Sequence, residues 1–389
     1  MNSKKFLIPL SSPNLKGNEN KYLKNCINTN FVSSIGKYVS TFEKKISKFL
    51  NVNYAVTCNS GTSALHLALL TLGIKSNHEV IIPTISFIAT ANAISYLNAS
   101  PIFMDCDKYY NIDIKKLLSF LKNETYQKKN QCYNKSSKKR ISAIIVVHVF
   151  GNAVDITPVI KICRKKNIKI IEDAAGALGT KYLKGKFKNR FAGTIGDIGC
   201  ISFNGNKILT CGGGGALLTN KKIFYKKSLY LSTQAFNNKD DYTHNEIGYN
   251  YRLTNLQAAV GLAQLERVNV FLKKNKQIYD FYKQNLKKIN FISFDEKPKY
   301  AKNNNWLISI SLKKKFKNKK NSFLKLLFKE KVQSRSIWRP IHLQKKYKKF
   351  QKYKISFANT IFKNTVNLPA GNNIKISEIK KVIKKLKKL

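Results

Sequence analysis

One lysine of this sequence stands where a reactive amine could be made. Lys207 closes the run SFNGNK, residues 202–207, and four consecutive glycines follow at 212–215. A lysine at the end of a buried strand loses hydration, which lowers its pKa and frees its amine to attack an aldehyde. Glycines beside it permit a sharp turn and a close approach of the backbone. The chain has 65 lysines (72 Lys plus Arg, of which 7 are Arg), so Lys207 taken alone fits a solvated surface lysine better.

Two adjacent carboxylates end an apolar run. Glu172 and Asp173 directly follow Ile170 and Ile171. One of them could face a cofactor while the other points away or binds backbone groups. A carboxylate beside a ring nitrogen keeps that nitrogen protonated, because opposite charges stabilise each other in a medium of low dielectric. A helix-capping Asp would explain the same pattern equally well.

A third segment is suited to binding a phosphate group. Residues 59–65, NSGTSAL, follow an apolar run and begin a helical pattern. The free backbone N–H groups at a helix start, together with small hydroxyls, form a natural cradle for an anion. An ordinary N-cap is the alternative interpretation of this motif.

The elements around these motifs alternate between short apolar runs and amphipathic stretches. Such alternation predicts an α/β domain with a largely parallel, buried sheet, in which ligands bind beyond the carboxyl ends of the strands. All three motifs lie just after such runs. The predicted strands are 54–57, 79–82, 101–104, 143–147, 168–171, 200–203 and 216–219, and the predicted helices include 63–72, 88–97, 114–121 and 158–166.

The remaining segments suggest a second, smaller part. Residues 122–140 are polar, basic and without an apolar period, so we expect a long surface loop there. Lys-rich helical patterns run from about residue 250 to 290, and the chain ends in an amphipathic helix, ISEIKKVIKKLKKL. We therefore expect a large domain over 1–250 and a smaller C-terminal domain over 251–389.

Composition excludes several classes of protein. The net charge is +52, but it comes from Lys spread along the whole chain, whereas nucleic-acid readers gather Arg on one element, so nucleic-acid binding is not expected as the main function. No stretch approaches about 18 uncharged apolar residues, and the start, MNSKKFLIPLSSP, lacks the apolar run of a secretory signal, so we expect a cytoplasmic protein outside the membrane. Seven cysteines without a CxxC pair predict reduced thiols and no metal site.

The motifs occur in an order that resembles a known family. SGTSAL, EDAA and SFNGNK with its glycine run are accompanied by PTISFIAT (83–90), VHVFG (147–151) with Asp155, and GYNYR (248–252). Together they resemble the DegT/DnrJ/EryC1/StrS family of pyridoxal-phosphate-dependent nucleotide-sugar aminotransferases. The resemblance covers nearly the whole chain and is weakest after about residue 290. It implies the type I, aspartate aminotransferase-like fold: a large domain with a mostly parallel seven-stranded sheet and a smaller C-terminal α/β domain.

The resemblance assigns roles to the candidate residues. It implies that Lys207 is the Schiff-base lysine for pyridoxal 5'-phosphate and that Asp173 pairs with the pyridine nitrogen of this cofactor. Asn250 would reach the phosphate from the neighbouring subunit, which implies at least a homodimer with a shared site, and Arg252 would lie near that contact. The other implied cofactor-binding residues are Gly61, Thr62 and Ser202 at the phosphate and Phe87 against the pyridine face.

The implied reaction is transfer of an amino group from glutamate to C4 of a nucleotide-linked 4-keto-6-deoxy hexose. The forms FNGNK, GGGG and NFVSSIG (30–36) are most similar to the LegC branch, which acts on the route to legionaminic acid and related N-acetylated sugars. A 3-keto substrate remains open. A sugar dehydratase of the same fold would carry His where this chain has Lys207. A basic nucleic-acid or membrane-surface protein with relic motifs is the remote alternative.

Three further positions bear on this resemblance. Many relatives carry Gln, His or Glu three residues after the aspartate, whereas this chain has Gly176, which removes a side-chain contact near the cofactor ring. The segment 338–342, WRPIH, resembles one that returns to the active site, and packing explains it equally well. His148 matches a family position, although we interpret it as a core histidine whose ring nitrogens are both hydrogen-bonded.

Overall fold

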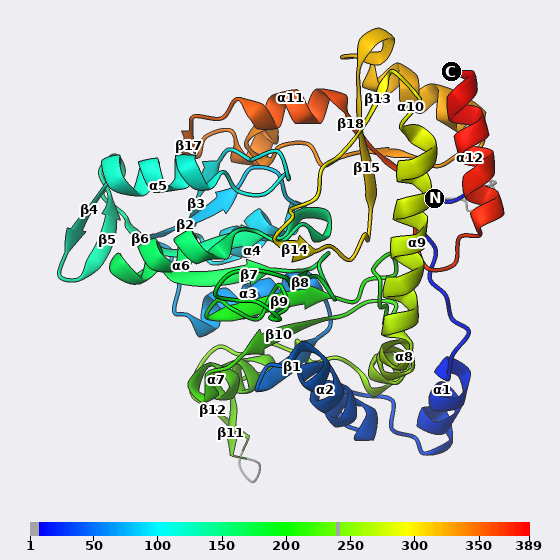
Figure 1. Ribbon diagram of the computed structural model, residues 1–389. Helices are drawn as coiled ribbons and strands as arrows, with labels where there is room; N and C mark the ends of the chain where they lie inside the picture. Colours follow the sequence, from blue (N-terminus) through cyan, green and yellow to red (C-terminus); the bar gives the residue numbers. More distant parts are fainter. Residues whose placement is uncertain (1–7, 239–241) are drawn as a thin grey trace.

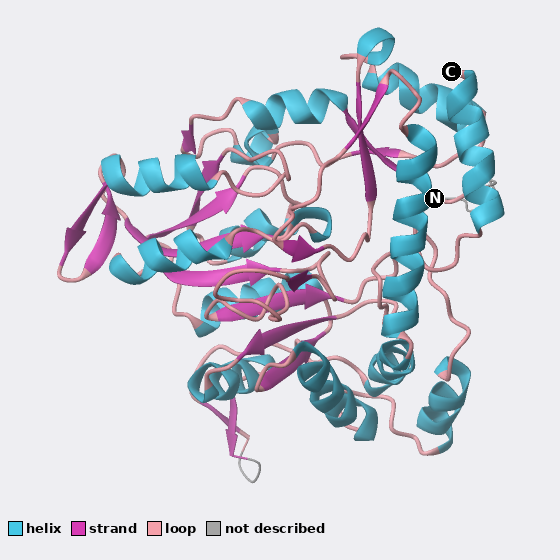
Figure 2. Cartoon of the chain, viewed as in Figure 1, coloured by secondary structure: helices cyan, strands magenta, loops and turns pink. Residues whose placement is uncertain are grey.

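The computed structural model describes residues 8–238 and 242–389 (Figures 1 and 2). The first seven residues of the MNSKKFLIPLSSP segment lie outside these ranges. A ten-stranded sheet crosses the middle of the molecule, with helices packed against it (Figure 2). Its main path runs, in spatial order, through β1 (Tyr54–Cys58), β10 (Gly215–Thr219), β9 (Ile198–Ser202), β7 (Lys169–Asp173), β6 (Arg140–Val147), β2 (His78–Pro83), β3 (Ser100–Met104) and β17 (Lys352–Tyr353).

The sheet is mostly parallel. Along this path only β10 runs antiparallel to its two neighbours, so β1 and β9 point the same way as β7, β6, β2 and β3. All seven predicted strands form, with ends within two residues of the predicted ones except at β6, which begins three residues earlier than predicted. The parallel strands therefore deliver their carboxyl ends, and the motifs that follow them, to one edge of the sheet.

The apolar strands are buried on both faces because helices cover both. Ile144 belongs to one hydrophobic cluster and its neighbour Ile145 to another, as the alternation of side chains along a strand requires. One face packs on α3 (Gly61–Thr71), α4 (Ala89–Tyr96) and α7 (Lys222–Ser232). The other packs on α1 (Glu19–Asn28), α2 (Lys37–Leu50), α5 (Ile114–Asn123), α6 (Ile156–Lys165) and α8 (Asn255–Glu266).

The loop predicted for residues 122–140 is wrong. After the last turn of α5, a hairpin of β4 (Thr125–Lys128) and β5 (Gln131–Asn134) forms and joins the edge of β6. Lys129 and Asn130 make its turn with left-handed φ angles of 48° and 57°. Cys132 and Asn134 are buried while their neighbours are more exposed, so a period of two was present in this polar run. The high Lys and Asn content concealed it.

The C-terminal part is built around a small antiparallel sheet. Its strand order is β13 (Ile292–Phe294), β15 (Ile308–Leu312), β18 (Thr365–Leu368) and β16 (Arg335–Ser336). The third hydrophobic cluster joins Ile8 to residues between 278 and 386, and Figure 1 shows the N-terminal segment beside α9 and α12. A domain boundary at 250/251 stays a proposal. The helices of the C-terminal part are α9 (Val268–Leu286), α10 (Lys320–Lys329), α11 (Phe357–Asn364) and α12 (Ile376–Lys388). Two small strand pairs lie outside both sheets: β8 (Lys181–Tyr182) with β14 (Ala301–Lys302), and β11 (Phe236–Asn238) with β12 (Thr243–His244).

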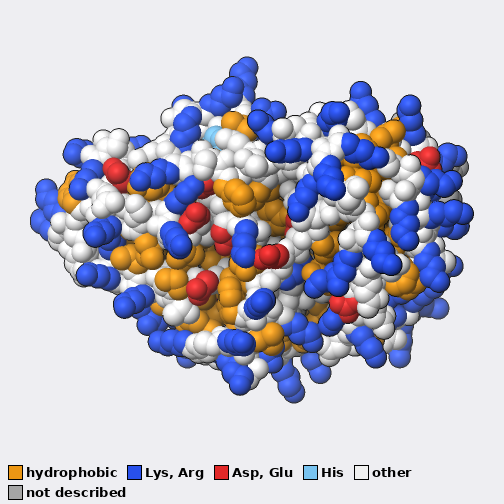
Figure 3. Space-filling model, turned by 45° about the horizontal axis from the view of Figure 1, so that its top comes forward, with side chains coloured by type: hydrophobic (Ala, Val, Ile, Leu, Met, Phe, Trp, Pro, Cys, Tyr) orange, Lys and Arg blue, Asp and Glu red, His pale blue; other side chains and the backbone are white. Residues whose placement is uncertain are grey.

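The face of the molecule that Figure 3 displays is basic. Lys and Arg side chains are scattered over the whole visible face, with few acidic groups between them (Figure 3). This scatter fits a general solvated surface better than one strip for a nucleic-acid backbone. Across residues 8–238 and 242–389, no helix has both the length and the apolar character needed to cross a bilayer.

One buried carboxylate fastens α11 to the central sheet. Asp105, at the end of β3, accepts hydrogen bonds from Lys116 Nζ at 2.5 Å and from the backbone amides of Ser356, Phe357 and Ala358 at 2.9–3.0 Å. It thus satisfies the first-turn amides of α11, which Ser356 does not cap with its own side chain. Burial by itself would raise the pKa of Asp105, but Lys116 and these amides bring it down to about 2.

We expect Asp105→Asn to lower the free energy of unfolding at pH 7 by about 2 kcal/mol, since it removes a charged hydrogen-bond acceptor. The folded-state pKa lies below the unfolded value of roughly 3.9, so the stabilisation is complete above pH 4 and is lost as the pH falls toward 2. Urea unfolding of both proteins between pH 2 and 7 measures this. A difference between the two proteins that stays constant over that range would contradict the assignment.

Candidate active site

The carboxyl ends of the parallel strands open into a cavity of about 390 Å³. Six of the seven residues to which the sequence analysis gave a catalytic or cofactor-binding role line it. They come from four different places in the fold: the start of α3, the segment after β2, the end of β7, and the end of β9 with the turn after it. These six residues are Gly61, Thr62, Phe87, Asp173, Ser202 and Lys207.

The start of α3 forms a cradle at one end of the cavity. Ser60 is the N-cap, and its hydroxyl accepts a hydrogen bond from the amide of Ser63 at 3.0 Å. A Cβ at Gly61 would lie 2.9 Å from Cβ of Ser202, so only glycine lets the helix start and the end of β9 come this close. Gly61, Thr62 and Ser202 therefore surround a site at the positive end of a helix dipole, which suits a phosphate.

The two adjacent carboxylates have different surroundings, as the sequence suggested: one binds backbone amides and the other faces the cavity. Glu172 is fully buried and accepts hydrogen bonds from His148 Nε2 at 2.9 Å and from the amides of Gly193, Ile195 and Gly196 at 2.6–2.9 Å. Burial would raise its pKa, but these donors leave it lowered. Glu172 thus holds the 193–196 turn against β7 and takes no part in the cavity.

Asp173 is the carboxylate that faces the cavity. It is 5 % exposed and accepts one hydrogen bond from Thr90 Oγ1 at 2.8 Å and one from the amide of Ala175 at 3.1 Å. Burial raises the pKa of Asp173, and these two donors with the Lys207 charge only partly offset it. A cation inside the cavity would stabilise the charged form of Asp173 and lower its pKa. The site therefore fits a protonated ring nitrogen.

Lys207 is the amine of the cavity. It follows β9 in a turn in which its amide donates to the carbonyl of Asn204 at 2.9 Å. Burial lowers the pKa of Lys207 to about 8, with the charge of Asp173 acting in the opposite direction. Its Nζ lies 3.7 Å from the centre of the Trp306 ring. Lys207 is part-buried, and its lowered pKa favours the neutral amine that attack on an aldehyde requires.

Aromatic rings form the mouth of the cavity. Phe87 is 57 % exposed, and its ring centre lies 6.2 Å from that of Trp338. Trp338 also packs on the buried ring of Phe150, with 4.7 Å between the ring centres, and this contact fixes the position of its indole. Of the WRPIH segment, Trp338 lines the cavity, whereas His342 is buried and pairs with Thr84 Oγ1 at 2.6 Å. The segment both packs and contributes to the site.

Asn250 is the one predicted site residue outside the lining of this cavity. Its carbonyl accepts a hydrogen bond from the side chain of Asn59 at 3.2 Å, next to the phosphate cradle. Arg252 nearby pairs with Glu43 at 2.7 Å. A role for Asn250 in a partner subunit therefore stays a proposal.

Three residues of the site are not among those predicted from the sequence. Thr90, which binds Asp173, was quoted only as part of a motif, and Trp306 and Arg335 line the cavity from the segment where the resemblance is weakest. One signal was available: the chain has only two tryptophans, and both line this cavity. His148, by contrast, is a core residue, because its Nδ1 accepts from the amide of Val154 while its Nε2 binds Glu172.

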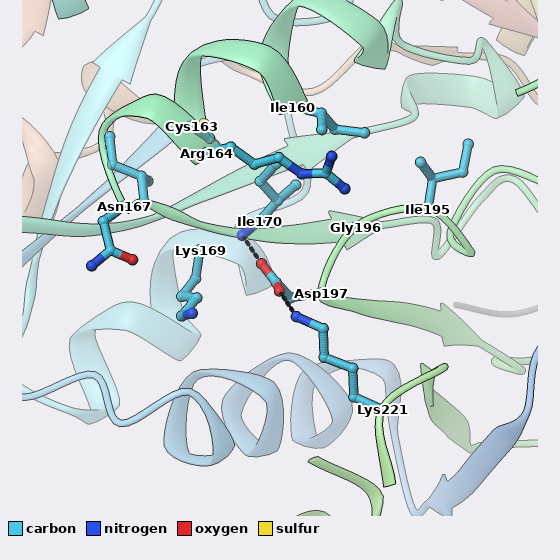
Figure 4. Close-up of a pocket in the computed structure, with 11 residues that line it drawn as sticks. Ile160, Cys163, Arg164, Asn167, Lys169, Ile170, Ile195, Gly196, Asp197 and Lys221 are labelled. Carbon is cyan, nitrogen blue, oxygen red and sulfur yellow. Dashed lines mark hydrogen bonds and ion pairs between the residues drawn. The ribbon is translucent and has the colours of Figure 1, made fainter. Parts of the chain in front are cut away.

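A second hollow lies at the opposite end of β7 and carries no comparable chemistry. It measures about 270 Å³ (Figure 4). Asp197 in it accepts hydrogen bonds from the amide of Ile170 at 2.9 Å and from Lys221 at 2.6 Å, so its carboxylate already has partners. The first cavity is the candidate active site.

Comparisons with known proteins agree with this geometry. A model of the DegT/DnrJ/EryC1/StrS aminotransferase family matches residues 13–387. GDP-perosamine synthase of Escherichia coli O157:H7 is 35 % identical over 93 % of both chains. UDP-4-amino-4,6-dideoxy-N-acetyl-β-L-altrosamine transaminase of Campylobacter jejuni is 31 % identical over 89 % of this chain and 88 % of its own. The solved structure of Helicobacter pylori PseC, an aminotransferase of pseudoaminic acid biosynthesis, superposes with a TM-score of 0.87 at 26 % identity over 98 % of both chains.

The fold is that of a type I pyridoxal-phosphate-dependent aminotransferase. The chain belongs to the DegT/DnrJ/EryC1/StrS aminotransferase family, and its relatives include nucleotide-sugar aminotransferases. The cavity fits the cofactor of that family: a glycine-based anion cradle, a buried carboxylate short of a cation and a desolvated amine stand around one space.

Proposed function

We propose that this nucleotide-sugar aminotransferase moves the amino group of glutamate to C4 of a nucleotide-linked 4-keto-6-deoxy hexose. The observation that carries the proposal is the enclosed amine of Lys207 beside the buried carboxylate of Asp173. The Campylobacter jejuni relative is named for a 4-amino-4,6-dideoxy, N-acetylated product, which favours a 2-acetamido hexose. The proposed pathway is synthesis of nonulosonic acid, with legionaminic acid as one such product, or of another surface-polysaccharide amino sugar.

Each residue of the cavity has a separate proposed role. Pyridoxal phosphate, when bound, supplies an electron sink. Lys207 would hold the aldehyde carbon of the cofactor, and the free amine of Lys207 would take a proton from the donor carbon and later return one to the sugar carbon. Asp173 keeps the ring nitrogen protonated, and Thr90 and Ala175 orient that carboxylate. Gly61, Thr62 and Ser202 hold the phosphate.

The mouth of the cavity suits a nucleotide-linked deoxy sugar. Arg335 lines it and can pair with the diphosphate, and the positive surface draws such an anion toward the site. Phe87 is proposed to lie against the pyridine face of the cofactor, and the ring of Trp338 beside it offers an apolar face to a methyl group in place of a hydroxymethyl group. These contacts act on the part of the substrate that does not react, so they contribute to binding and orientation.

The test is amine transfer from ¹⁵N-glutamate to a panel of GDP-, UDP- and dTDP-linked 4-keto-6-deoxy sugars, with the product analysed by NMR. We expect ¹⁵N at C4 of at least one sugar. Label at C3 would replace the assignment by a 3-aminotransferase. Loss of a C3 hydroxyl without label would indicate a dehydratase, against which Lys207 speaks. No label in any sugar would remove the proposed substrate class.

We also propose a homodimer in which Asn250 completes the phosphate site of the partner. Asn250 is exposed and lies beside the cradle of its own subunit, so a two-fold axis passing near this point would bring it to the cradle of the partner. The cytoplasm is the proposed location, because all seven cysteines are free thiols, as is usual in reducing compartments.

A shared site predicts complementation between two inactive variants. We expect Lys207→Ala and Asn250→Ala subunits, each inactive alone, to regain about a quarter of wild-type activity after mixing and reassembly, because half of the dimers then carry one intact site. Size-exclusion chromatography with light scattering confirms that hybrids form. Hybrid dimers without activity would contradict a site shared in this way.

A further inference from the structure

A tryptophan from the C-terminal part forms part of the wall of the candidate active-site cavity. Trp306 is 4 % exposed, and its Nε1–H donates to the carbonyl of Asn206 at 2.7 Å. Asn206 immediately precedes Lys207, so this hydrogen bond ties the indole to the turn that carries the reactive amine. Trp306 is one of only two tryptophans in the chain.

The ring occupies the place where a side chain at 176 would begin. A Cβ on Gly176 would lie 2.6 Å from the ring atoms Cε3 and Cζ3 of Trp306, closer than such atoms ever approach. Asn304 fastens this arrangement, because its side-chain amide donates to the carbonyls of Gly176 and Leu178 at 3.0 and 2.9 Å. Its side-chain oxygen accepts from the amide of Trp306 at 3.1 Å. A side chain at 176 and this indole position therefore exclude each other.

The same ring covers the reactive amine. Nζ of Lys207 lies 3.7 Å from the ring centre, well inside the range in which an ammonium group is attracted to an aromatic face. The contact joins the end of β9 to a residue about a hundred positions away, and it limits where the amine can lie. Asp173, on the neighbouring strand, lines the same cavity.

We propose that Trp306 is the positioning residue for Lys207, and that Gly176 is the residue that makes room for it. The face of the indole attracts the Lys207 ammonium and keeps this side chain within the cavity, where the amine can meet an aldehyde once it has lost its proton. This inference rests on the proposed role of Lys207. It also accounts for the glycine three residues after Asp173: the indole takes the space that a polar side chain at this position would need.

The first test measures the contact without any cofactor. In full-length Trp338→Phe protein freed of pyridoxal phosphate, Trp306 is the sole tryptophan, so its fluorescence reports on its surroundings. We expect the emission to change between pH 6 and 10 with a midpoint near 8, as the Lys207 ammonium loses its proton. The change should vanish in Trp338→Phe/Lys207→Met. Identical pH profiles in both proteins would overturn the inference, whatever reaction the enzyme catalyses.

The second test separates positioning from packing. Trp306→Phe keeps an aromatic face toward Lys207, whereas Trp306→Leu fills the space without one. We expect the rate constant for capture of added pyridoxal phosphate, followed by absorbance, to fall about tenfold in the Leu variant and no more than about twofold in the Phe variant. Thermal unfolding should shift to a similar extent in both variants. Equal capture rates in the two variants would mean that Trp306 only packs.

The third test addresses the pairing with Gly176. Gly176→Ala alone should displace the indole and slow capture about tenfold, since the added Cβ overlaps the ring. Added to Trp306→Ala, the same change should cost little, because the ring is already gone. Strict additivity of the two effects in the double variant would contradict the proposed exclusion.

Discussion

Lys207→Ala is expected to reduce amine transfer at least about 10³-fold, because one amine serves both as the attachment point and as the proton carrier. The purified variant should also lack the near-visible absorption band that pyridoxal phosphate gives when linked to a lysine. The initial rate with glutamate and the preferred keto sugar, together with the absorption spectrum, measures the two effects separately.

The matched control for this change is Lys186→Ala. Lys186 is an exposed lysine in the turn after β8 and touches no part of the cavity. We expect the control to keep both its rate and its absorption band, although it loses the same charge. A Lys207→Ala enzyme with more than a few per cent of the wild-type rate would show that another group moves the proton.

Asp173→Asn is the second substitution with a large expected effect. It keeps the size of the side chain but removes the charge opposite the ring nitrogen, and we expect amine transfer to fall about 10²-fold or more. The asparagine can still bind Thr90 or the amide of Ala175, so the fold should survive with little change in thermal stability. The cofactor should remain bound, with a shifted absorption band.

The neighbouring carboxylate provides the contrast. Glu172→Gln disturbs a fully buried group that accepts bonds from His148 and three backbone amides, so its main effect should be a lower unfolding temperature. The rate per folded molecule should change less than in Asp173→Asn. If Glu172→Gln lost the reaction and Asp173→Asn kept it, the roles of the two carboxylates would have to be exchanged.

The sequence predicted most of the large domain because its signals are local. Each buried strand is a continuous apolar run, and parallel strands bring the residues that follow them to one edge, which places Gly61, Asp173 and Lys207 together without further information. The choice between Glu172 and Asp173 was open from the residues alone, since both end the same strand. It depends on where the 193–196 turn comes to lie.

The parts that escaped prediction depend on contacts between distant segments. Nothing near Trp306 in the sequence indicates that its ring lies over Lys207, since the contact follows from how Asn304 binds the 176–178 turn. The hairpin at 125–134 was hidden by a lysine-rich composition that masked its alternation. The role proposed for Asn250 requires a second subunit, so it does not follow from the fold of a single chain.

The attachment of the cofactor to Lys207 is the central claim, and it can be tested directly. The purified protein, loaded with pyridoxal phosphate, is reduced with borohydride, digested and mapped by mass spectrometry. One phosphopyridoxyl group is expected, on the peptide that contains Lys207, although the chain has 65 lysines. A label on any other lysine, or no stable label after reduction of the loaded protein, would contradict it.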